Sequence, residues 1–201
     1  MDISSKEKDS LTMTTDTDEQ SSEALMLAYA DGNAEAFTQL YNLHKGSLFR
    51  FLLRQGITSA RADEMFQDIW LKIINGKSRY KVTARFQTWL YSIARNLIID
   101  EYRKEGKMES IEFEDAVTDK SDTSPVMNNP EEGIDQKTKQ QHLLKSVEAL
   151  PFEQRQAFLF RYEAGMTNQD IAEITGTNLE TAKSRVRYAV AQLKLKLGGS
   201  Q

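Results

Sequence analysis

One segment of the chain, residues 108–135, carries no hydrophobic period and separates two parts that do. It contains two of the three prolines, nine acidic residues and one base, Lys120. Connections of this length are uncommon inside a compact domain and are usually functional or disordered. The chain is therefore predicted to form two small units joined by an acidic linker, rather than one continuous domain.

Both flanking parts have the periodicity of helices, and the expected fold is all-α. Residues 1–21 are rich in Ser, Thr, Asp and Glu and are predicted to be a disordered tail. The first bundle is expected over residues 22–107 and the second over residues 136–198. Helices are predicted over 22–30, from a cap at Asn33 to Gly56, from about Thr58 to Gly76, from about 86 to Gly106, over 136–149, and from Pro151 through Tyr162.

Two capping signals near the C-terminus predict a helix-turn-helix. Thr167 to Asp170 is a variant capping box, and Thr177 to Glu180 is a fuller one in which the acid reaches back to the cap. Between the two helices that they open lies Thr175-Gly176, a tight turn with the spacing of a helix-turn-helix.

The N-terminal part of the last helix is the first candidate DNA-binding surface. In a helix-turn-helix, this part of the second helix enters the major groove, where Arg and Lys side chains can donate hydrogen bonds to guanine and to phosphates. The alternative is a set of solvated surface charges, but no acid follows Glu180. The candidate residues are Lys183, Ser184, Arg185 and Arg187.

Basic and aromatic residues are also interleaved between Arg79 and Asn96. Aromatic rings can stack on unpaired bases while Lys and Arg hold phosphates. Phe86 and Trp89 fit the apolar face of the helix and are expected in the core. The candidates for contact are Tyr80, Lys81, Arg85, Arg95 and Asn96.

Composition argues against several other classes of protein. The chain has no cysteine, and its two histidines, His44 and His142, lie far apart without a ligand cluster, so a metal is not expected. No phosphate-binding glycine motif is present, and the paired carboxylates Glu131 and Glu132 fall in the linker, so neither an enzyme nor a cofactor is expected. The sequence offers no signal peptide or membrane span, which favours the cytoplasm.

Several strings together resemble the extracytoplasmic-function sigma factors of bacterial RNA polymerase. The segment from Phe86 to Asn96 is similar to their promoter-melting part, and Asp31 to Phe37 with Leu40-Tyr41 is similar to the start of their region 2. Their polymerase-binding helix resembles Ala62-Asp63-Glu64 with Gln67-Asp68 and Trp70. Their region 4 resembles Leu150-Pro151 with Arg155, Ile171-Ala172 and Thr181 to Arg185.

The resemblance implies a role for each candidate. Region 2 would melt the −10 element and capture a flipped base, with Asn96 at the matching pocket position and Tyr80 to Arg85 in the contacting loop. Region 4 would read the −35 element. Core RNA polymerase and promoter DNA would be the partners, and an anti-sigma factor is expected. The residues that would face the polymerase are Asp63, Glu64, Gln67 and Asp68.

Two other functions remain open on the sequence. A helix-turn-helix regulator would bind duplex DNA without polymerase, but this leaves the cluster at residues 79–96 unexplained. A helical adaptor or enzyme domain would place its important residues away from both basic surfaces. The acidic linker itself has two interpretations, a plain tether or a polyanion that masks the basic surfaces of the free protein.

Overall fold

The computed structural model describes residues 21–106 and 136–198, and every regular element in them is helical, as predicted. The predicted tail, except Ser21, and the linker over 108–135 with its proposed masking lie outside these ranges. The elements are α1 (Ser22–Ala30), α2 (Ala34–Leu53), α3 (Ser59–Gly76), the 3-10 turn η1 (Lys77–Arg79), α4 (Phe86–Lys104), α6 (Gln136–Glu148), α7 (Phe152–Tyr162), α8 (Asn168–Thr175) and α9 (Leu179–Gly198).

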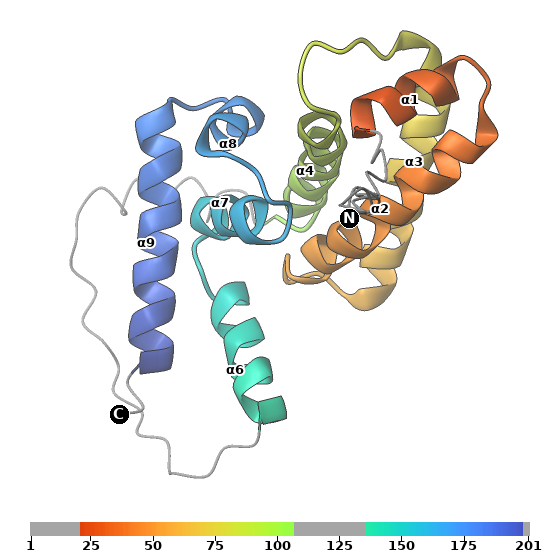
Figure 1. Ribbon diagram of the computed structural model, residues 1–201. Helices are drawn as coiled ribbons and strands as arrows, with labels where there is room; N and C mark the ends of the chain where they lie inside the picture. The colour runs from red at the N-terminus through yellow and green to blue at the C-terminus, as the bar shows by residue number, and fades with distance from the viewer. Residues whose placement is uncertain (1–20, 107–135, 199–201) are drawn as a thin grey trace, which may run out of the picture.

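The first four helices form one bundle (Figure 1). Helix α2 packs against α1 and α3, and α4 packs against α3 and α1. The side chains at helical spacing in α3 face this core as predicted, with Met65, Ile69 and Ile73 fully buried. The Asn33 cap is also confirmed, because its side chain accepts hydrogen bonds from the N–H groups of Glu35 and Ala36.

The last four helices form the second bundle, in which α9 packs against α7, α8 and α6. Helices α8 and α9 are joined by residues 176–178, with Gly176 in the left-handed region at φ 66°. The capping box predicted at Thr167 is present, since the side chain of Asp170 accepts from Thr167 N while Thr167 accepts from Asp170 N.

The second predicted capping box is wrong. Helix α9 begins at Leu179, and the side chain of Asn178, rather than Thr177, accepts from the N–H of Thr181 at 2.8 Å. Glu180 pairs with Lys183 at 2.8 Å instead of reaching back to a cap. Asn is as good a cap as Thr, and the Thr177 hydroxyl is engaged with that of Thr175 at 2.9 Å.

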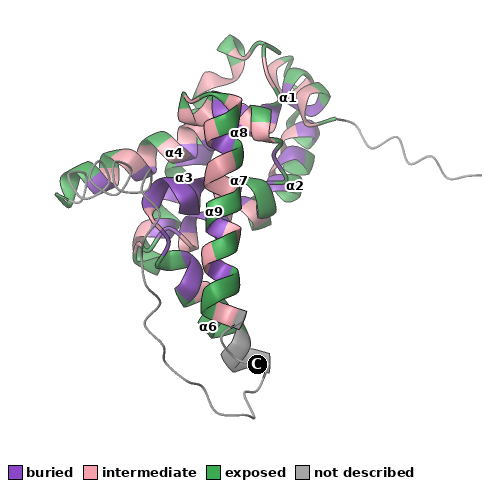
Figure 2. Cartoon of the chain, turned by 90° about the vertical axis from the view of Figure 1, so that its left-hand side faces the viewer, coloured by how far each residue is buried: buried purple, intermediate pink, exposed green. Residues whose placement is uncertain are grey.

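Helix α7 is the part of the second bundle that faces the first, and most of its residues are buried (Figures 1 and 2). Its buried residues include Glu153, Arg155 and Gln156, which would be costly without partners. The side chain of Gln156 donates to that of Gln55 in the first bundle at 2.5 Å. Arg155 donates to the hydroxyl of Tyr102 at 2.6 Å. These polar pairs join the two bundles, and so does an apolar contact between Phe51 and Phe160.

Candidate nucleic-acid interface

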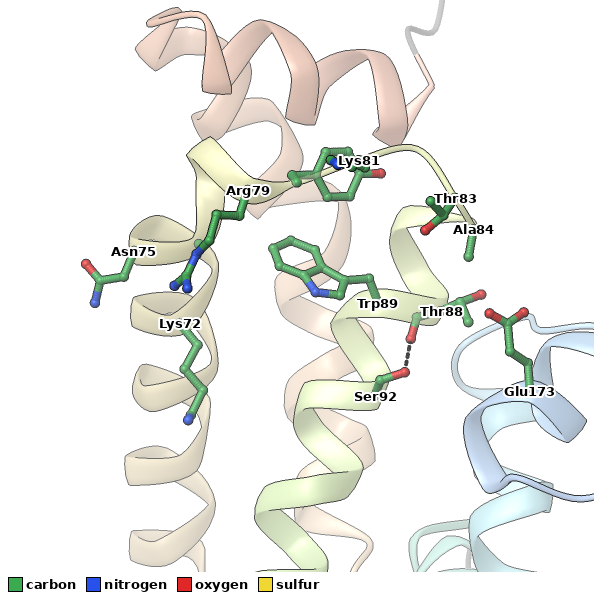
Figure 3. Close-up of a pocket in the computed structure, with 12 residues that line it drawn as sticks. Lys72, Asn75, Arg79, Lys81, Thr83, Ala84, Thr88, Trp89, Ser92 and Glu173 are labelled. Atoms are coloured by element: carbon green, nitrogen blue, oxygen red, sulfur yellow. Dashed lines mark hydrogen bonds between the residues drawn. The ribbon is translucent and has the colours of Figure 1, made fainter.

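A hollow of about 710 Å³ opens between α3, the segment that follows it and α4 (Figure 3). The rings of Tyr80 and Trp89 form its apolar wall, with centroids 5.1 Å apart. Lys72, Arg79 and Lys81 supply positive charge around it. The hollow thus combines aromatic surfaces with cations, which is the composition of sites for unpaired nucleotides.

Close packing of α3 against α4 positions the Trp89 ring. Gly76 ends α3, and a Cβ built there would lie 3.5 Å from Trp89 Cζ2, at van der Waals distance. The indole packs against the end of α3, where a Cβ would also fit, and one surface of the ring is left toward the hollow. Trp89 is therefore half-buried rather than in the core as expected, whereas Phe86 is fully buried as predicted.

Helix α1 supplies the cap of α4. The carboxylate of Glu23 accepts a hydrogen bond from the N–H of Phe86 at 2.7 Å, in the first turn of α4. Burial alone would raise the pKa of Glu23, but this hydrogen bond and others to its carboxylate hold the pKa below its ordinary value. The cap thereby fixes where the loop over 80–85 ends and where α4 begins.

His44 supports the same junction from beneath. Its Nε2 lies 2.7 Å from the Ser22 hydroxyl, and its ring is 5.2 Å from that of Phe86. Burial lowers the pKa of His44, and the nearby Glu23 carboxylate opposes this only in part. His44 is thus a structural histidine, whereas His142 is exposed. Within the described residues, acids and histidines form no group able to hold a metal ion.

The structure brings only some of the −10 candidates together. Tyr80 and Lys81 line the hollow. Arg85 is exposed beside it and lies 3.8 Å from Asp170 of α8. Arg95 pairs with Glu153 of α7 at 2.8 Å. Asn96 is exposed further along α4 and is not among the residues that line the hollow.

The −35 candidates lie on the first turns of α9. Lys183 and Arg187 are exposed, and the Arg187 guanidinium lies 5.2 Å from the Tyr188 ring. Ser184 is half-buried. Arg185 differs from these two basic residues because it donates a hydrogen bond to Glu153 at 3.0 Å, and only 16% of its side chain is exposed.

The residues predicted to face core polymerase lie on the solvent side of α3. The exposed side of the helix carries Asp63, Glu64, Gln67 and Asp68. Its opposite side is buried and includes Met65 and Ile69. Glu64 accepts from Arg61 at 2.6 Å, and Arg61 also binds Glu101 of α4 at 2.8 Å. This surface therefore includes a carboxylate whose charge is partly balanced within the bundle.

The residues of the hollow that sequence reasoning missed include Lys72, Asn75, Arg79, Ser92 and Glu173. Lys72 and Asn75 are three residues apart on the polar side of α3, so they share a face of that helix. This spacing was a usable signal, but nothing in the sequence indicates that α3 ends beside the start of α4. Ser92 donates to the carbonyl of Thr88 at 2.6 Å, one turn earlier in α4.

Comparison with known proteins identifies the family. The family model for Sigma-70 region 2 matches residues 40–108, and the family model for Sigma-70, region 4 matches residues 140–193. The chain is also 32% identical over 171 residues to the ECF RNA polymerase sigma factor SigL of Mycobacterium tuberculosis (strain ATCC 25618 / H37Rv), covering 84% of this chain and 92% of SigL. The chain belongs to the extracytoplasmic-function sigma factors.

Other relatives of this sigma factor agree in length and fold. The ECF RNA polymerase sigma factor RpoE of Cereibacter sphaeroides is 28% identical over 184 residues, covering 90% of this chain and 98% of RpoE. Two solved structures share the fold: CnrH in complex with the cytosolic domain of CnrY (TM-score 0.65, 18% identity, 90% and 100% covered) and the sigma factor RpoE in complex with the anti-sigma factor NepR from Bartonella quintana (TM-score 0.62, 24% identity, 82% and 98% covered).

The sigma factor thus directs promoter-specific initiation by RNA polymerase and is not an enzyme. This confirms the family indicated by the sequence and excludes the adaptor and the polymerase-independent regulator. Across the described ranges, none of the helices has the length and apolar character needed to span a bilayer.

Proposed function

We propose that this sigma factor captures an unpaired base of the −10 element in the hollow between α3, the loop over 80–85 and α4. One observation carries the proposal: an aromatic wall, Tyr80 and Trp89, meets a rim of cations. Extruding a base costs a few kcal/mol. Stacking on an aromatic ring is worth about 1–3 kcal/mol per base, which is enough to offset that cost.

Asn96 is the second candidate for base capture, because the resemblance to the family places it at the pocket position. Its exposure on α4 supports contact with the DNA, but it is separated along α4 from the hollow. The two candidates differ in what they offer a base. Trp89 offers a stacking surface, whereas Asn96 offers an amide that pairs with base edges.

Strand opening by the holoenzyme distinguishes the two candidates. Trp89→Leu keeps an apolar side chain against Gly76 but removes the indole, and Asn96→Ala removes the amide. Permanganate reactivity of the opened strand is expected to fall with Trp89→Leu and to stay at the wild-type level with Gln39→Ala, an exposed control in α2. A loss with Asn96→Ala alone would assign capture to Asn96, and wild-type opening by all three variants would refute both assignments.

For the −35 element, we propose that the start of α9 reads duplex DNA through Lys183, Ser184, Arg185 and Arg187. Support comes from the three-residue turn between α8 and α9 and from the exposure of Lys183 and Arg187. Residues in these first turns are the ones that a helix-turn-helix presents to base edges and phosphates.

We further propose that the exposed acidic side of α3 binds core polymerase through Asp63, Glu64, Gln67 and Asp68, and that residues 22–107 and 136–198 act as regions 2 and 4. The cytoplasm is the expected location because the polymerase acts there. One structural neighbour, RpoE from Bartonella quintana, is a sigma factor solved with the anti-sigma factor NepR, so an anti-sigma factor is proposed here as well.

A further inference from the structure

The basic side chains around the hollow have no partner in the described part of the protein. Lys72, Arg79 and Lys81 line the hollow and form no hydrogen bond, ion pair or ring contact with another described residue. Most other basic residues of the first bundle are engaged; Arg61, for example, binds two carboxylates. Cations that share one hollow without an acid between them repel one another, and a bound anion would relieve that repulsion.

The positive charge lies on the α3 side of the hollow. In the close-up, the guanidinium of Arg79 points along α3 toward Lys72, and both side chains lie on the same side of the Trp89 ring (Figure 3). The acid in the lining, Glu173 of α8, lies at the opposite edge. A guanidinium binds a phosphate with two parallel hydrogen bonds, and an ammonium binds it as a point charge. A phosphate is therefore favoured between Lys72 and Arg79.

Beside this charge, the hollow offers a surface for a base. Trp89 presents one surface of its indole, and the Tyr80 ring lies 5.1 Å away at an interplanar angle of 45°. Thr88 lines the same space, and a hydroxyl can both donate and accept hydrogen bonds. At about 710 Å³, the hollow has the size of a site for a small ligand. A stacking surface next to two cations suits one nucleotide with its phosphates.

We propose that the hollow is a binding site for free nucleoside phosphates, with the base on Trp89 and the phosphates between Lys72 and Arg79. A nucleotide held there occupies the surface that the proposed function assigns to an unpaired −10 base, so the nucleotide and the strand compete. The competition rests on the proposed function, whereas the nucleotide site does not. The free sigma factor then binds the −10 strand less tightly when nucleotide is abundant.

A series of ligands tests what the site recognises. Isothermal titration calorimetry with the full-length free protein measures the binding of ATP, AMP, adenosine and inorganic tripolyphosphate. ATP is expected to bind most tightly, because it combines a base with the largest charge, and added salt should weaken ATP more than adenosine. Equal binding of tripolyphosphate and ATP would overturn the proposal, because the cations alone would then explain it. An absence of ATP binding would overturn it as well.

Substitutions test where the ligand lies. Lys72→Gln and Arg79→Gln each remove one phosphate contact, and Trp89→Leu removes the stacking surface. Each is expected to weaken ATP binding about fivefold or more. Lys104→Gln is the matched control, because Lys104 is an equally unpartnered, exposed cation near the end of α4 that does not line the hollow.

An equal loss of ATP binding in Lys104→Gln would overturn the proposal, and so would wild-type binding by both Lys72→Gln and Arg79→Gln. These two positions are exposed, so their substitution should leave the fold intact. They therefore decide the matter even if Trp89→Leu unfolds, as seen by circular dichroism.

Tryptophan fluorescence reports the position of the base. The chain has two tryptophans, and Trp70→Phe leaves Trp89 as the single indole. Trp70 is buried and its N–H has no hydrogen-bond partner, so the substitution costs no hydrogen bond. ATP is expected to quench Trp89 more strongly than tripolyphosphate does. Normal ATP binding without quenching would place the base away from Trp89 and overturn the proposal.

Competition separates this proposal from the proposed function. ATP is expected to displace a fluorescent single strand with the −10 sequence from the free protein, as measured by anisotropy, and a failure to displace it would refute the competition. If ATP does not bind while Trp89→Leu impairs strand opening, the nucleotide site is wrong and base capture stands. If ATP binds as expected but Trp89→Leu opens the promoter normally, base capture in the hollow is wrong and the nucleotide site stands.

Discussion

The rings of Phe51 and Phe160 stack at an interplanar angle of 19° with their centroids 5.1 Å apart, although one belongs to α2 and the other to α7. Both side chains are fully buried, and Tyr91 of α4 meets Phe160 edge to face at 6.1 Å. The two bundles therefore share part of one apolar core. In the free protein they are expected to unfold together rather than as independent units.

Phe160→Ala tests this shared core. Deleting a fully buried phenyl ring is expected to lower the free energy of unfolding by about 3–5 kcal/mol and to separate the unfolding of the two bundles into two transitions. Urea unfolding followed by circular dichroism measures both effects. Tyr162→Ala, two residues further along and 59% exposed, is the control and should change stability by no more than about 0.5 kcal/mol. A single transition with wild-type midpoint in Phe160→Ala would contradict a shared core.

Lys183→Ala is expected to weaken the −35 contact of the holoenzyme. A lost contact to a base is worth about 1–3 kcal/mol, so the apparent affinity measured from footprints of the −35 region should decrease by about 5–150-fold. Lys194→Ala removes another exposed charge from the far part of α9 and serves as the control. Equal footprints for both variants would show that the start of α9 does not read the promoter.

Charge reversal on α3 tests the polymerase contact. Asp63→Lys and Asp68→Lys change exposed residues whose carboxylates form no ion pair with another described residue, so their effect on folding should be small. Both are expected to reduce the amount of holoenzyme formed with core polymerase, measured by gel filtration. Glu35→Lys reverses an exposed acid on α2 and should leave assembly intact. Normal assembly by both α3 variants would place the polymerase contact elsewhere.

The stability of the protein is expected to depend on His44 at mildly acidic pH. Its pKa in the folded state lies below the ordinary value of 6.5, because burial disfavours the charged ring. The unfolded chain therefore binds a proton first, and stability is lost as the pH falls from about 6.5 toward the folded pKa. Urea midpoints at neutral and acidic pH measure this loss. His44→Gln should show less of it, whereas His142→Gln, at an exposed position, should behave as the wild type.

The sequence predicted the helices well because their signals are local. Apolar spacing identifies the buried side of α3, and caps such as Asn33 and Thr167 mark helix starts within a few residues. The errors at Thr177 and Glu180 are also local. Two adjacent residues, Thr177 and Asn178, are both good caps, and only the path of the turn selects between them.

The contact between the bundles could not be predicted from the sequence. The string Glu153-Gln154-Arg155-Gln156 has the composition of a solvated surface, yet all four residues are buried. Two of their partners lie in the first bundle: Tyr102, which binds Arg155, is 53 residues away, and Gln55, which binds Gln156, is 101 residues away. Such pairs depend on the docking of two bundles across the linker, for which neither hydrophobic period nor capping chemistry provides a signal.

The cap that Glu23 provides to α4 has a practical consequence for how the protein is handled. Any shortened version that begins after α1 would leave the Phe86 N–H without its acceptor and release the loop that borders the hollow. A bulky tag placed directly before Ser22 would lie next to Glu23 and could disturb the same hydrogen bond. Promoter opening measured with trimmed or tagged protein would then report the condition of the amino-terminal helix as much as the chemistry of the promoter.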